Sequence, residues 1–68
     1  MPTIEIGLDQ RRPINAAHAE YTRQTRDIEM IVEGPPLFSG STQSGLTLIV
    51  SQGFAAFLEA RGIVFRPA

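Results

Sequence analysis

The chain contains no cysteine, lysine or tryptophan, and His18 is the single histidine among its 68 residues. Without cysteine it forms neither disulfides nor thiolate metal sites, and one histidine gives little basis for a metal centre. A chain this short buries only about 60% of the surface that its unfolded state exposes, so it is marginally stable without a staple or a partner. We therefore expect no metal or cofactor, and association with another protein or with a second copy.

The chain also lacks a large excess of charge of either sign, and it lacks long apolar runs. Six arginines stand against seven acidic residues, for a net charge of −1. Nucleic-acid binders normally concentrate a basic excess on one face, so no nucleic-acid partner is expected. No run approaches the roughly 20 apolar residues of a membrane span, and residues 1–6 do not resemble a signal peptide. These features predict a cytoplasmic protein with no membrane partner, and the use of arginine alone as cation suggests a GC-rich bacterial or phage genome.

The first part of the chain predicts a strand followed by a helix. Residues 3–8 alternate apolar and polar side chains, as in a half-buried strand. Pro13 suits the first turn of a helix, and apolar residues recur at helical spacing from Ile14 to Ile28.

The end of this helix has two interpretations. If it stops near Arg26 or Asp27, residues 28–33 form a strand, which the β-branched Ile31-Val32 pair and the alternation favour. That strand would turn Ile28, Met30 and Val32 toward the core, and Glu29, Ile31 and Glu33 outward. If it continues, one helix covers 13–33, which the absence of a glycine near residue 27 favours. The strand is the preferred interpretation.

The second half of the chain predicts strand, helix and strand after a loop. Two consecutive prolines, Pro35 and Pro36, continue neither a helix nor a central strand, so residues 34–45 are predicted as a flexible loop between the halves of a single domain, 1–68. A strand follows over 46–50. Ser51 is then an N-cap, Gly62 a left-handed helix stop, and the last strand turns Ile63 and Phe65 inward.

The sum is a small α+β two-layer sandwich of β-α-β-β-α-β order, the ferredoxin-like or split βαβ arrangement, with one sheet face open. The alternative is one long helix over 13–33 packed on a three-stranded sheet. The order and length resemble the heavy-metal-associated and ACT-type ferredoxin-like modules. Residues 9–12 are Asp-Gln-Arg-Arg where the former carry Cys-x-x-Cys, and Gly7 stands alone where the latter carry a glycine-rich loop. The resemblance therefore implies no ligand and no activity.

Catalytic chemistry has little support in the sequence. His18 has no cysteine nucleophile beside it, and no serine stands in a G-x-S-x-G context. Glu5, Glu29 and Glu33 share the predicted open face, where exposed carboxylates are ionised and inert. Residues 39–45 are rich in glycine and hydroxyls but lack the lysine and the spacing of a P-loop. We expect no enzyme.

The open sheet face is the most informative surface. Ile31, Ile49 and Val64 would form an apolar centre rimmed by glutamates and Arg66, which is how protein-binding surfaces are built. An RNA-binding sheet would carry aromatic residues there, and this face has none.

The leading hypothesis is a non-enzymatic interaction module that self-associates or docks through its sheet, as an accessory or regulatory subunit or an inhibitor of a larger protein. The alternative is a small-ligand or anion-binding regulatory domain that uses Arg11 and Arg12, at the start of the helix, together with residues 39–45. An antitoxin-like DNA-binding protein is the third hypothesis.

Overall fold

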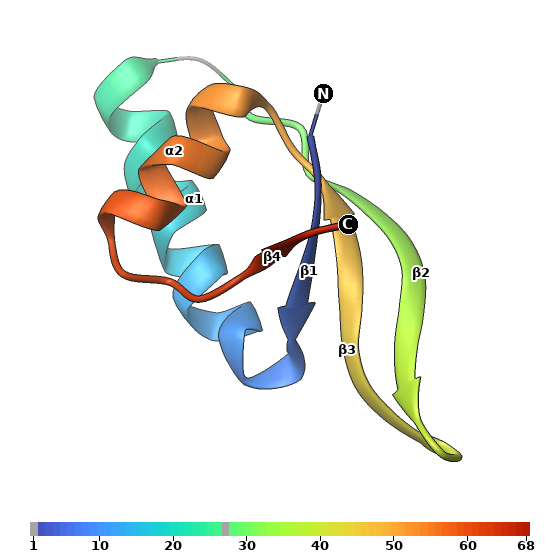
Figure 1. Cartoon of the computed structure of the whole chain (residues 1–68). Coiled ribbons are helices and arrows are strands. Elements are labelled where there is room, and N and C mark those ends of the chain that lie inside the picture. Colours follow the sequence, from blue (N-terminus) through green and yellow to red (C-terminus); the bar gives the residue numbers. More distant parts are fainter. Residues whose placement is uncertain (1, 27) are drawn as a thin grey trace.

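A computed structural model describes residues 2–26 and 28–68. Their elements follow in the order β1 (Thr3–Gly7), η1 (a 3₁₀ turn, Leu8–Gln10), α1 (Arg11–Thr25), β2 (Val32–Ser39), β3 (Thr42–Ile49), α2 (Gln52–Ala60) and β4 (Arg66–Pro67). The strands form one antiparallel sheet in the order β2-β3-β1-β4. Both helices lie on one of its faces (Figure 1). The predicted small α+β class is confirmed.

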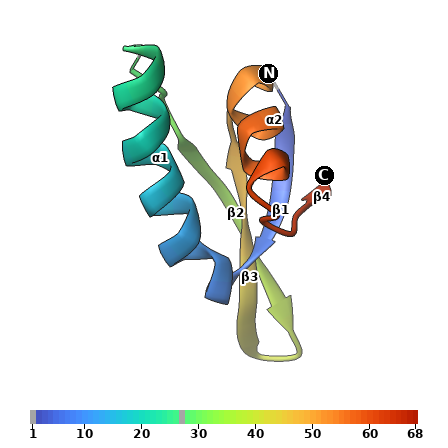
Figure 2. The ribbon, with the colours of Figure 1, turned by 90° about the vertical axis from the view of Figure 1, so that its left-hand side faces the viewer.

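The core lies between the sheet and the helices. Alternation along β1 sends Ile4 and Ile6 to the helix side, opposite Leu48 and Leu46 of β3. Phe54 of α2 is fully buried among aromatic rings. The buried apolar side chains of the described residues are Ile4, Ile6, Ile14, Ala17, Leu46, Leu48, Val50, Phe54 and Leu58. Figure 2 shows α1 on the β2 side of this layer and α2 on the β1 side.

The helix α1 ends at Thr25 without a glycine. Arg26 adopts the left-handed conformation with φ of 60°, and its N–H donates to the carbonyl oxygen of Thr22 at 2.9 Å. The alternative of one helix over 13–33 on three strands is therefore wrong. The strand predicted over 28–33 is also only partly right, because β2 begins at Val32. Asp27, the other suggested end point, lies outside the described residues.

The side chains of residues 28–31, between α1 and β2, point the opposite way from the prediction. Ile28 and Met30 are 81% and 67% exposed, whereas Glu29 is buried and Ile31 packs against the core. Exposure still alternates from Ile28 to Ile31, but in the phase opposite to the prediction, and these residues lie before the start of β2. Their orientation is decided by the polar contacts of Glu29, described below.

Residues 34–45 are not a loop between halves. They belong to a hairpin in which β2 and β3 pair from Val32↔Ile49 to Ser39↔Thr42. The pairing shifts between Glu33 and Pro36, and β2 is an edge strand. Prolines are tolerated in sheets at edges and bulges, where no ladder donor is needed. Since β1 pairs with β3 only over residues 45–49, the tip of the hairpin extends beyond the rest of the sheet (Figure 1).

The ends of α2 agree with their sequence signals. The Ser51 side chain accepts a hydrogen bond from the N–H of Phe54 at 3.1 Å, and Gly62 has φ of 75°. The last strand is shorter than predicted, because β4 holds only Arg66 and Pro67. Ile63 and Phe65 lie in the connection before it, yet both pack against the core.

Candidate functional site

A groove of about 560 Å³ lies between α1 and the β2–β3 hairpin. Its floor is apolar and fully buried, made by Ile6, Ile14, Leu46 and Leu48. Residues 28–31, which connect α1 to β2, also line the groove. Apolar hollows with a few polar groups on their walls are the usual form of binding sites in proteins, so this groove is the first candidate.

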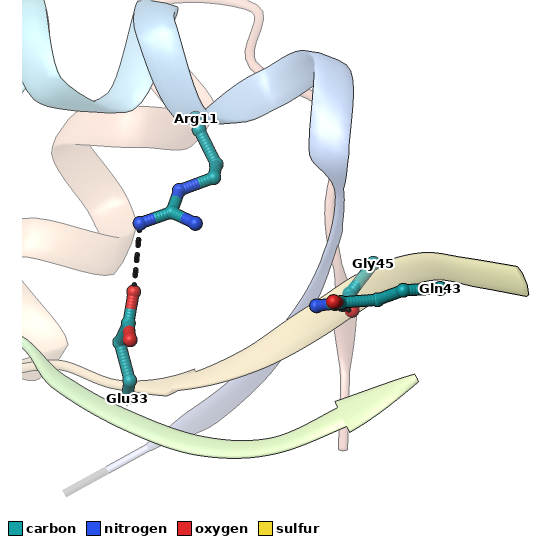
Figure 3. Close-up of polar contacts among 4 residues, drawn as sticks. All are labelled: Arg11, Glu33, Gln43 and Gly45. Carbon is teal, nitrogen blue, oxygen red and sulfur yellow. Dashed lines mark hydrogen bonds and ion pairs between the residues drawn. The ribbon is translucent and has the colours of Figure 1, made fainter. Parts of the chain in front are cut away.

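One face of α1 supplies the polar wall of the groove. Arg11, Asn15 and His18 line it at positions i, i+4 and i+7, a span of about 10 Å along the helix axis. At the first end, Nη2 of Arg11 lies 2.9 Å from Oε1 of Glu33 on β2 (Figure 3). Both side chains are more than half exposed, so this ion pair adds little to stability and its partners can exchange.

The other end of the groove is fixed by hydrogen bonds. Nε2 of His18 lies 2.8 Å from the backbone oxygen of Glu29. A carbonyl oxygen only accepts, so Nε2 carries the proton and donates. The Glu29 carboxylate accepts from the Ser51 N–H at 3.0 Å and from the Ser51 hydroxyl. This network holds segment 28–31 against α1 and the start of α2.

The same network explains the exposed apolar residues at the groove. Because Glu29 turns inward to Ser51, its neighbours Ile28 and Met30 turn outward, and both line the groove. The groove therefore joins a buried apolar floor to an exposed apolar rim, a combination that usually marks a binding surface.

A second hollow, of about 230 Å³, lies on the sheet face away from the helices. Arg66 stands opposite Glu5 in the pairing of β4 with β1, and Nη2 of Arg66 lies 3.6 Å from Oε1 of Glu5. Val64 lines the hollow and is 73% exposed, and Leu37 of β2 reaches it from the other side. This open face thus carries one ion pair beside apolar side chains.

The residues predicted for an interaction surface divide between the two faces. Val64 and Arg66 line the same hollow. Ile49 is paired with Thr3 and Val32, whose row lies on the open face. Ile31 does not join them, since it lines the groove on the helix side.

The predicted anion site is not assembled as expected. Arg11 lines the groove, but neither Arg12 nor any residue of 39–45 does, because 39–45 belong to the hairpin and its turn. The three glutamates do not share the open face either. Glu5 lies there beside Arg66, whereas Glu33 bonds Arg11 and Glu29 bonds Ser51 on the helix side. Within the described ranges, no cluster of three acidic or histidine side chains is arranged to hold a metal ion.

The groove itself was not predicted from the sequence. The spacing of Arg11, Asn15 and His18 indicates that their side chains share one face of the helix. It does not indicate which part of the chain packs opposite that face. The groove exists because residues 28–31 lie outside the sheet. The contact between Glu29 and Ser51 holds them there, and these two residues are 22 positions apart in the sequence.

Comparisons with protein-family models, with curated proteins and with solved structures give no match for this chain. Neither helix of the described residues combines the length and the apolar character that crossing a membrane would require. The function is therefore argued from the two surfaces alone.

Proposed function

We propose that the chain is a non-enzymatic protein-interaction module that self-associates through the open face of its sheet. The observation that carries this proposal is the ion pair of Glu5 and Arg66 beside exposed Val64. A twofold interface requires a patch that is complementary to itself. A surface that holds one acidic and one basic side chain next to apolar residues meets this requirement, since each charge can face its opposite on a second copy.

Exposure supports the use of these side chains across an interface. Arg66 is 81% exposed and Glu5 29%, so the guanidinium is free to take a second carboxylate. Val32, at 49% exposure, and Ile49 add apolar surface at the β2–β3 side of the face. An apolar centre with a charged rim is the usual anatomy of a protein interface, and it suits an accessory or regulatory subunit.

The need for additional burial supports self-association as well. A core this small supplies only about 3–5 kcal/mol of stability, and the chain has no cysteine with which to form a stabilising disulfide. Burying exposed valines against a second copy would contribute about 25 cal/mol per Å² of apolar surface.

We also infer that the element order and the sheet order β2-β3-β1-β4 define the split βαβ, ferredoxin-like arrangement. The antiparallel pairing of β1 with both β3 and β4 supports this inference. The short β4 is the element on which it depends most. Backbone amide exchange would test it, because protection of Ala68, whose N–H donates to Thr3 at 2.9 Å, is expected only if β4 is paired.

Light scattering and sedimentation at micromolar concentration test self-association directly. We expect a dimer whose mass falls to that of one chain in Val64→Glu and in Ile49→Glu. An Arg23→Glu variant on exposed α1 surface is the control for added negative charge, and it should remain dimeric. A wild-type chain that is monomeric at every concentration tested would contradict the proposal.

Charge exchange separates contacts between copies from the contact within one chain. Glu5→Arg and Arg66→Glu each place like charges together, so each variant alone should be monomeric. Mixed in equal amounts, they should form a heterodimer, since the two arginines of the first variant then meet the two glutamates of the second. If the mixture stays monomeric while the wild type is dimeric, the ion pair does not lie in the interface.

A further inference from the structure

We propose that the groove between α1 and the hairpin binds a small free monocarboxylate with an apolar chain. Its volume of about 560 Å³ lies within the range of small-molecule sites, about 300–1,000 Å³. The proposal does not depend on self-association, because the groove lies on the helix side of the sheet and the interface on the open face.

The floor and the rim would hold the apolar part of the ligand. Ile14, Leu46 and Leu48 line the groove, are at most 4% exposed and have wholly apolar side chains. Ile28 and Met30 stand exposed at its edge, so a bound chain would bury them as well. Methionine is flexible and polarisable and fills irregular gaps. An extended chain of about 10 Å matches the span of α1 that lines the groove.

Arg11 would hold the carboxylate. A guanidinium has five N–H donors in a planar fork, and the contact with Glu33 uses Nη2. The remaining donors can take a second carboxylate without breaking the ion pair. Among the described residues the Asn15 side chain, one turn along the same wall, makes no hydrogen bond, so its amide is available as a further donor.

The position of Arg11 at the start of α1 favours a ligand with a negative charge. Arg11 begins a 15-residue helix whose first turn contains no acidic residue. The helix dipole there favours an anion and disfavours a cation. Two carboxylates of the lining oppose it. Glu33 would weaken binding of a carboxylate without preventing it, since its side chain is 57% exposed and screened by solvent. The carboxylate of Glu29 is already bound by the N–H and the hydroxyl of Ser51.

NMR titration of the ¹⁵N-labelled chain with octanoate tests the site, with 1-octanol and octylammonium as probes of the same chain length. We expect octanoate to shift the amide signals of α1, Ile31 and Leu48, and to bind at least fivefold more tightly than either comparison compound. Arg11→Gln should lose that preference. Arg12→Gln, the matched control outside the groove, should keep it.

Glu33→Gln tests whether Arg11 binds the carboxylate directly, because a purely structural role of Arg11 would leave the affinity for octanoate unchanged in this variant. It removes the competing carboxylate, so octanoate should bind severalfold more tightly than to the wild type, while 1-octanol is unchanged. The same titrations on Ser39→Ala, an exposed position of the hairpin that does not line the groove, should give the wild-type affinity. Equal binding of all three probes, no binding below about 5 mM, or full octanoate affinity in Arg11→Gln would overturn the proposal.

Discussion

At the scale of the residue, Ser51 joins three parts of the molecule. Its hydroxyl accepts from the N–H of Phe54 and donates to the carboxylate of Glu29, and its own N–H donates to the same carboxylate. One short side chain therefore caps α2 and holds segment 28–31 in place. The sequence predicted the first role from the position of a serine before an apolar helix, and it contained no indication of the second.

Ser51→Ala should lower the free energy of unfolding by about 2 kcal/mol. Loss of the N-cap accounts for about 1 kcal/mol, and a buried carboxylate that loses a donor accounts for a similar amount. Urea unfolding followed by circular dichroism measures the difference. Ser39→Ala, at an exposed position of the hairpin, should change stability by less than about 0.5 kcal/mol. Equal effects of the two substitutions would contradict the double role of Ser51.

At the scale of the element, the end of α1 shows how a helix can stop without its usual sequence signal. A glycine after a helix allows the left-handed conformation at no steric cost, and Gly62 does so after α2. Arg26 takes the same conformation after α1 at a cost of about 1–2 kcal/mol. The contacts of Glu29 with Ser51 and of Ile31 with the core offset this strain, and they can form only if the helix ends before them.

Arg26→Gly should therefore stabilise the chain by about 0.5 kcal/mol, the relief of strain less the additional entropy of glycine in the unfolded state. Arg23→Gly is the matched control. It makes the same change inside α1, where glycine costs about 1 kcal/mol, so its effect should have the opposite sign. Chemical unfolding of both variants provides the test, and destabilisation by Arg26→Gly would show that the arginine side chain contributes more than its backbone costs.

At the scale of the whole molecule, stability depends on a few fully buried side chains. Phe54 has no exposed surface and contacts the rings of His18, Tyr21 and Phe57, with centroids 5.9, 5.2 and 6.5 Å away. Tyr21 and His18 come from α1, so Phe54 connects the two helices.

Phe54→Ala should abolish cooperative unfolding. The substitution of a buried phenylalanine costs about 3–5 kcal/mol, which equals the whole stability expected of so small a core. Thermal and urea melts of this variant should show no transition, whereas Phe38→Ala should melt like the wild type, because Phe38 is 60% exposed. A cooperative transition in Phe54→Ala at low concentration would mean that the core is more redundant than its size suggests.

The sequence by itself determined the local elements that carry their own signals. Alternation defined β1, the serine and glycine defined α2, and the lack of cysteine excluded disulfides. Short-range propensities and caps decide these features, and they are visible within a few residues.

Only the tertiary structure decided the hairpin, the direction of segment 28–31 and the groove. Pro35 and Pro36 indicate a break unless the strand is known to lie at a sheet edge. Glu29, between Ile28 and Met30, indicates an outward carboxylate unless Ser51 lies beside it. Pairing partners that are many residues apart decide each of these cases, so the same residues allow either outcome until the fold brings the partners together.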